Sequence, residues 1–129
     1  MINKVKLYEQ FVNENSVDKK FIVKNHKFEL LINDNLVAES KFNIERKDEF
    51  FNEKYVSIYE LETFEQFRNK GYARILLDEI FDHVKNKLNL NIISLIVDKN
   101  NYGAVNLYFN NGFEIFMEYE DSYSLIKKL

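Results

Sequence analysis

The stretch FRNKGYARILLDEIF, Phe67 to Phe81, places one of the three glycines of the chain between a short charged run and a segment with helical spacing. From Tyr72 to Leu88, apolar residues recur at steps of three and four with charged residues between them, which predicts an amphipathic helix. Gly71 stands directly before this helix, where the N–H groups of a first turn point outward at the positive end of the helix dipole. A side chain at that position would block a ligand from approaching the backbone.

Positive charge gathers around the same point. Arg68, Lys70 and Arg74 flank the glycine, and the small Ala73 keeps the next turn open. We interpret the segment as an anion cradle of the phosphate type, although a lone glycine before a helix is also found in ordinary turns and caps. No GK[ST] follows and no G-x-G-x-x-G is present, so the cradle is neither a Walker loop nor a dinucleotide fingerprint.

Length and composition limit the class of protein. The chain has 129 residues, 46% hydrophobic and 30% charged, which suits one globular domain over residues 1–129 with a single sizeable core. The net charge of -3 lacks a large block of either sign, so we expect neither nucleic acid nor a membrane surface as partner. The absence of cysteine excludes disulfides and a thiol nucleophile within this sequence, and it fits a reducing, cytoplasmic setting.

The first half of the sequence reads mainly as strands. Phe28 to Ile32 and Leu36 to Ile44 flank Asn33-Asp34-Asn35, which predicts a hairpin. Tyr55 to Phe64, rich in β-branched and aromatic residues, is expected to be a third strand of that sheet. Val5 to Val12 has a spacing that suits either a helix or a strand.

The second half alternates helices and strands. Asn91 to Val97 is short and almost wholly apolar, as in a strand covered on both faces. Tyr102 to Asn110 is predicted to be a helix that ends at Gly112, a natural left-handed C-terminal residue. Phe113 to Met117 and Tyr123 to Ile126 are expected to be two closing strands.

Two ordered motifs carry a resemblance to a known family. The run Arg68-Asn69-Lys70-Gly71-Tyr72-Ala73 resembles the R/Q-x-x-G-x-G/A signature of the GCN5-related N-acetyltransferase (GNAT) superfamily, which binds the pyrophosphate of acetyl-coenzyme A. VDKNNYGAVNLYFNNGF, Val97 to Phe113, looks like the second signature of that superfamily. A helix and an apolar strand separate the two, as in the family, and the resemblance spans about Tyr55 to Ile126.

The resemblance implies an α+β fold. Its expected features are a mixed, mostly antiparallel sheet, a splayed parallel pair formed by Tyr55–Phe64 and Asn91–Val97, flanking helices, and N-terminal helices shortened or absent. Acetyl-coenzyme A is the implied co-substrate, with no metal. The residues implied to contact it are Leu61, Thr63, Phe67, Arg68, Lys70, Gly71, Tyr72, Ala73, Arg74 and Asn101.

For Asn101 and Tyr108, the resemblance implies a functional role, while each residue also suits an ordinary structural role. The amide of Asn101 is implied to hydrogen-bond the pantetheine arm, and Asn is also a common N-terminal cap for a helix beginning at Tyr102. The hydroxyl of Tyr108 is implied to donate a proton to the departing thiolate, and Tyr108 also suits a core position beside Leu107 and Phe109.

The sequence does not identify the general base that removes a proton from the attacking amine. Glu60 and Glu62, on the strand that leads to the cofactor loop, are candidates for catalysis, with Glu118 and Glu120 more distant. Ordered water is the alternative. Glu118, Glu120 and Asp121 would suit a cationic acceptor.

Taken together, the sequence predicts an acyl-CoA-dependent N-acetyltransferase that moves acetyl to a primary amine, on a small molecule or a peptide, by direct attack in a ternary complex. The alternative is a non-catalytic module of the same fold that binds coenzyme A or a protein partner. Between Asn13 and Lys27 there is little room for the two helices common in the family, so these are shortened or replaced by strands. Aromatic residues from Phe113 to Tyr123 suggest a homodimer.

Overall fold

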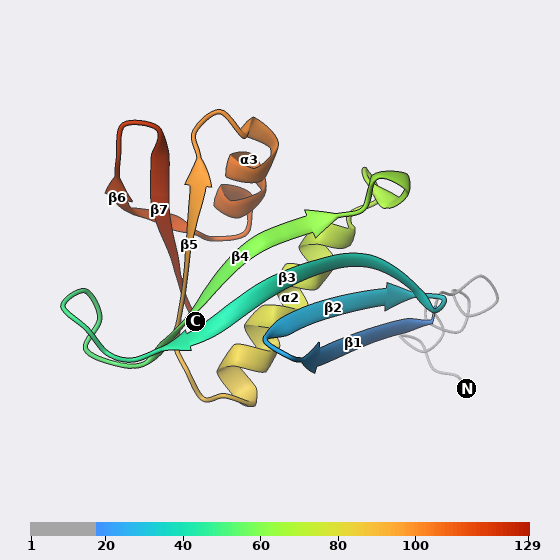
Figure 1. Cartoon of the computed structure of the whole chain (residues 1–129), viewed down its shortest axis with the longest axis horizontal. Coiled ribbons are helices and arrows are strands. Elements are labelled where there is room, and N and C mark those ends of the chain that lie inside the picture. Colours follow the sequence, from blue (N-terminus) through green and yellow to red (C-terminus); the bar gives the residue numbers. More distant parts are fainter. Residues whose placement is uncertain (1–17) are drawn as a thin grey trace, which may run out of the picture.

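The computed structural model describes residues 18–129, which form one mixed sheet with helices against it (Figure 1). The segment Val5–Val12, of ambiguous pattern, lies outside the described residues. The strands are β1 (Lys19–Lys24), β2 (Lys27–Ile32), β3 (Asn35–Glu45), β4 (Tyr55–Thr63), β5 (Ile92–Asp98), β6 (Glu114–Glu118) and β7 (Ser122–Lys128). The helices are the 3-10 helix η1 (Glu65–Phe67), α2 (Tyr72–Asn86) and α3 (Tyr102–Asn110). The sheet order is β1-β2-β3-β4-β5-β7-β6.

Strands β1 to β4 form an antiparallel meander because their first two connections are tight turns. Asn33 and Asp34, between β2 and β3, have φ of 52° and 67°, the left-handed conformation that hairpin turns require and that Asn and Asp tolerate. The predicted hairpin is therefore confirmed. Strand β1 lies within the segment from Asn13 to Lys27, so the described part of this segment contains a strand, which is one of the two arrangements expected.

Helix α2 carries the chain from β4 back to the start of β5, which makes these two strands parallel. Its apolar residues at helical spacing, Leu76, Leu77, Ile80 and Val84, are fully buried against the sheet. The helix ends at Asn86, two residues before the predicted limit of Leu88. Helix α3 has the predicted bounds, and Gly112 follows it with φ of 92°, as expected for a left-handed C-terminal residue.

The parallel pair separates soon after it starts. Only Val56 with Ile93 and Ser57 with Ser94 are paired between β4 and β5, and the strands then spread apart (Figure 1). Each strand is held by its other neighbour, because β4 stays paired to β3 as far as Thr63 and β5 is paired to β7 along its whole length. The splayed parallel pair predicted from the sequence is thus confirmed.

The two faces of the sheet differ. On β5, Ile93, Leu95 and Val97 join the main core beneath the helices, while Ser94 and Ile96 alternate to the opposite face. A second, smaller core cluster forms on that opposite face from Phe51, Ile92 and Ile126, with Tyr55 and Phe116 against it. None of the helices in residues 18–129 is long and apolar enough to cross a membrane.

Candidate active site

Two adjoining cavities occupy the gap where β4 and β5 part. The first, of about 360 Å³, is lined by Leu61, Glu62, Thr63, Arg68, Ala73, Asn101, Gly103, Ala104, Leu107 and Tyr108. The second, of about 260 Å³, is lined by Glu60, Leu61, Ile96, Val97, Asp98, Asn101, Ala104 and Tyr108. Four residues line both cavities: Leu61, Asn101, Ala104 and Tyr108. We call the pair the strand-gap cavity.

The start of α2 has free backbone donors. Gly71 is the N-cap residue, with φ of 82° and no side-chain cap. Within residues 18–129, the main-chain N–H groups from Asn69 to Arg74 have no hydrogen-bond acceptor. A Cβ built on Gly71 would meet nothing within 4 Å, so the space beside this backbone is open and the left-handed φ is the local reason for glycine. This geometry fits a bound anion such as a pyrophosphate.

Arg68 ties the loop before α2 to the end of β4. Its Nε donates a hydrogen bond to the carbonyl oxygen of Thr63 at 2.9 Å, and both residues line the strand-gap cavity. Phe67 and Tyr72 are partly buried, and their side chains pack against the core. The exposed Lys70 lines neither cavity, and Arg74 lines a neighbouring hollow of about 410 Å³ with Leu107, Asn110 and Asn111.

Asn101 caps helix α3. Its Oδ1 accepts a hydrogen bond from the N–H of Ala104 at 3.2 Å, which is the ordinary structural role considered above. Asn101 also lines both parts of the strand-gap cavity, and capping uses only the oxygen of its amide. The Nδ2 group can therefore donate to a ligand while the cap is intact.

Tyr108 is a buried residue that also lines the strand-gap cavity. It is a core residue, 7% exposed, with its ring packed edge-on against Phe113 at 5.4 Å between centroids. It also lines both parts of the strand-gap cavity. Burial raises the pKa of Tyr108 to about 12, so its hydroxyl is neutral and can donate a hydrogen bond at any ordinary pH.

The candidate bases differ in position. Glu60 has φ of 53°, at an irregularity where the pairing of β3 with β4 shifts, and it lines the strand-gap cavity. Its carboxylate is 2.9 Å from Nζ of Lys41, and this contact raises the pKa of Lys41. Glu62 lines the part of the cavity next to Arg68.

The more distant acids lie away from the cavity. Glu118 pairs with Lys99 at 2.7 Å, and Glu120 and Asp121 lie in the turn between β6 and β7. None of the three lines the strand-gap cavity.

Asp98 is a cavity residue that sequence reasoning missed. It ends β5 and lines the same part of the cavity as Glu60 and Tyr108. A polar residue directly after a buried parallel strand was the available signal, because ligand sites gather at the carboxyl ends of such strands. Within residues 18–129, no three His, Cys, Asp or Glu side chains cluster as a metal ion would require.

Comparisons with known proteins agree with this geometry. The sequence model described as Acetyltransferase (GNAT) family matches residues 5–113. No curated protein sequence matches the chain. The chain belongs to the GNAT acetyltransferase family, as the two motifs indicated.

Solved structures with the same fold have low sequence identity. PH1933 from Pyrococcus horikoshii OT3 is 22% identical with a TM-score of 0.69, covering 96% of this chain and 73% of that chain. The N-acetyltransferase PseH of Campylobacter jejuni, in complex with acetyl coenzyme A, is 23% identical with a TM-score of 0.63, covering 98% of this chain and 82% of that chain. Arabidopsis thaliana Naa50, in complex with the bisubstrate analogue CoA-Ac-MVNAL, is 21% identical with a TM-score of 0.64, covering 99% of this chain and 95% of that chain.

Proposed function

We propose that this chain transfers an acetyl group from acetyl-coenzyme A to a primary amine, by direct attack of the amine in a ternary complex. The observation that carries the proposal is the strand-gap cavity, which extends from Arg68 in the loop and Ala73 in the first turn of α2, past Tyr108, to Glu60 and Asp98. One route through the sheet therefore joins an anion site to a buried hydroxyl and to two carboxylates. Family membership and the acetyl-coenzyme A bound to PseH support the choice of donor.

The loop before α2 binds the pyrophosphate of the donor in this proposal. The free N–H groups from Asn69 to Arg74 and the positive end of α2 supply the attraction, and the side chains of Arg68 and Lys70 add charge. The unpaired inner edge of β4 at Leu61 to Thr63 offers backbone groups to the pantetheine arm, as an added strand would use them. Nδ2 of Asn101 donates to the same arm from the other side of the gap.

Tyr108 stabilises the leaving sulfur. A thiol has an ordinary pKa near 8.5, so a phenol whose pKa is about 12 would give up its proton to a thiolate only against an unfavourable equilibrium. We therefore assign Tyr108 a hydrogen bond to the sulfur as negative charge develops there. The proton that completes the thiol can come from the ammonium formed by the attack.

Glu60 and Asp98 serve the acceptor. Both lie at the side of the strand-gap cavity that is away from the α2 loop, where two carboxylates attract a cationic amine. Deprotonation must precede attack, because an ammonium has no free lone pair. Either carboxylate can take that proton directly or through water, and Lys41 holds the carboxylate of Glu60 in place.

A direct test measures release of coenzyme A with a thiol reagent, while mass spectrometry follows acetylation across a panel of amines. Transfer should depend on the amine, exceed hydrolysis without amine, and fall strongly in Tyr108→Phe. Tight binding of coenzyme A without transfer to any amine would instead indicate the binding module.

A further inference from the structure

A separate cavity lies on the face of the sheet opposite the helices. It has a volume of about 170 Å³ and is lined by Phe50, Phe51, Tyr55, Ser94, Ile96, Phe116, Met117, Tyr119 and Ser124. We call it the aromatic cavity. Five of its nine lining residues are aromatic, and its carboxylate-free wall contrasts with the strand-gap cavity.

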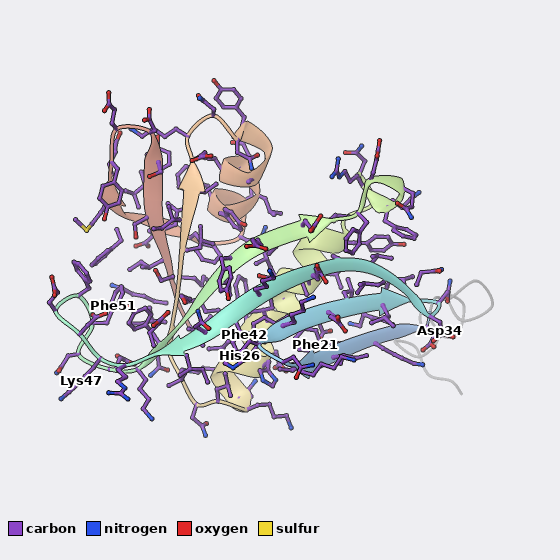
Figure 2. All side chains as sticks on the ribbon, in the orientation of Figure 1. Phe21, His26, Asp34, Phe42, Lys47 and Phe51 are labelled. Carbon is purple, nitrogen blue, oxygen red and sulfur yellow. The ribbon has the colours of Figure 1, made fainter. Side chains whose placement is uncertain are left out.

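The residues that line the aromatic cavity come from three segments of the chain that are distant in sequence, 50–55, 94–96 and 116–124. The loop from Arg46 to Lys54 contributes Phe50 and Phe51, and in Figure 2 Phe51 lies where this loop faces the β6–β7 hairpin. The ring of Phe51 is 4.9 Å from that of Phe116 on β6 and 4.7 Å from that of Tyr55 at the start of β4. The ring of Phe50 meets Phe116 edge-on at 6.0 Å.

Asp48 holds the loop in this position. Its Oδ1 accepts hydrogen bonds from the N–H groups of Phe50 at 2.8 Å and Phe51 at 3.0 Å, and its Oδ2 accepts one from the hydroxyl of Tyr55 at 2.7 Å. The hydrogen bond from Tyr55, followed by those from the backbone, lowers the pKa of Asp48. These three hydrogen bonds connect the loop residues Phe50 and Phe51 to Tyr55 at the start of β4.

Several of the cavity side chains are exposed although they are large and apolar. Ile96 is 70% exposed, Phe50 51%, Tyr119 45% and Met117 38%. Single exposed apolar residues are common, but a group of them around one hollow marks a binding surface.

Ile96 connects the aromatic cavity to the strand-gap cavity, because it lines both. Ser94, Ile96 and Asp98 alternate along one face of β5, so about 7 Å separates each from the next. A ligand whose amine lies near Asp98 and Glu60 therefore needs a spacer of only a few atoms to place an apolar group beside Ile96, at the near end of the aromatic cavity. The volume agrees, since a cavity of about 150 Å³ lined by apolar side chains accommodates a benzene ring.

We propose that the aromatic cavity is an acceptor subsite, and that the acceptor is a primary amine carrying an aromatic or similarly bulky apolar group about two to four carbons away. This inference rests on the proposed acetyl transfer and names its substrate class. Polyamines and aminoglycosides, which are charged or polar throughout, fit the aromatic wall poorly. The same chemistry is offered by a free phenylalkylamine and by a peptide that begins with phenylalanine, and the experiment below separates these sources.

Met117 gives a test of binding that does not depend on catalysis. The chain has two methionines, Met1 and Met117, so ¹³C-methyl labelling of methionine gives one NMR signal inside the aromatic cavity. Phenylalkylamines of graded chain length, or a peptide beginning with phenylalanine, should shift the Met117 signal saturably through the ring current. Spermidine, propylamine and a peptide beginning with alanine should not.

Two variants sharpen the test. Ser94→Phe fills the cavity and should lower kcat/KM for the preferred aromatic amine about 10-fold or more, with less than about a 2-fold change for propylamine. Ile115→Phe adds the same bulk to an exposed position on β6 that does not line the cavity, and it should leave both rates unchanged.

The outcomes distinguish the two claims. A Met117 signal unmoved by every aromatic amine and peptide would overturn the subsite, as would acetylation of propylamine or spermidine at the rate of the aromatic amines. A Met117 signal that depends on protein concentration and ignores amines would place a second copy of the chain in the cavity and also overturn it. Saturable shifts with no transfer to any amine would support the subsite and refute the proposed acetyl transfer.

Discussion

Helices α2 and α3 both begin at the edge of the strand-gap cavity, and they satisfy their first N–H groups in different ways. Helix α3 starts at Asn101, whose side chain accepts from Ala104. Helix α2 starts at Gly71, which offers no side chain, and the N–H groups from Asn69 to Arg74 lack acceptors within the described residues. An N-cap side chain contributes about 1 kcal/mol to a helix, so α2 forgoes stability that α3 retains. This difference is expected if the start of α2 binds an anion, as proposed above.

The largest expected effect comes from placing a side chain at Gly71, the N-cap residue of α2. Gly71→Val should abolish binding of acetyl-coenzyme A and leave the protein folded, because the new side chain fills the space beside the free N–H groups. The left-handed φ should cost about 1–2 kcal/mol of unfolding free energy. Calorimetry measures the affinity, and an unchanged value would refute the anion site.

Two further glycine variants sharpen that experiment. Gly112→Val strains a similar left-handed residue outside the strand-gap cavity, where the added Cβ meets only the movable end of the Lys127 side chain, so it should reduce stability and retain binding. Gly71→Asn gives α2 the residue type that caps α3 and tolerates a left-handed backbone. It should preserve stability and weaken binding.

Removal of the Tyr108 hydroxyl tests whether this group stabilises the leaving sulfur. Tyr108→Phe keeps the ring against Phe113, so the fold and donor affinity should change little, while kcat falls roughly 10-fold to 1,000-fold. A thiol leaving group that is more acidic should reduce the loss. Steady-state rates from about pH 6 to 9 measure it, and equal rates for both proteins would leave Tyr108 a core aromatic.

Variants of Asn101 separate its two roles. Asn101→Asp keeps an oxygen for the N–H of Ala104 and removes the Nδ2 donor, so stability should hold while affinity for acetyl-coenzyme A falls about 5-fold. Asn101→Ala removes both and should also lower the unfolding free energy by about 1 kcal/mol. Thermal melts and calorimetry measure the two effects, and full affinity in the Asp variant would restrict Asn101 to capping.

The smallest effect is expected from the exposed charges near α2. Lys70→Gln and Arg74→Gln should each weaken acetyl-coenzyme A about 2-fold to 3-fold at low salt and less at high salt, because neither side chain lines the strand-gap cavity and exposed charges are screened. Titrations at two ionic strengths check this. A loss as large as that of Gly71→Val would move the binding determinant from the backbone to the side chains.

The parts of the fold that follow from local pattern were predictable from the sequence. The spacing of Ile75, Leu76, Ile80, Phe81 and Val84 predicted α2. The resemblance carried by the two motifs implied the splayed strands around the site. The contact of Glu60 with Lys41 was not predictable, because it depends on an irregularity that shifts the register between β3 and β4. Phe50 and Phe51 lie in a loop without periodicity, and their place over β5 depends on hydrogen bonds to Asp48.

The assignment of the α2 start as the anion site is tested most directly by amide NMR with coenzyme A and with pantetheine, which lacks the pyrophosphate. Coenzyme A should shift the N–H signals of Gly71, Tyr72 and Ala73 strongly and saturably, as new hydrogen bonds form to groups that have no acceptor among residues 18–129. Pantetheine should leave these three signals in place. Binding of coenzyme A with all three unmoved would contradict the assignment.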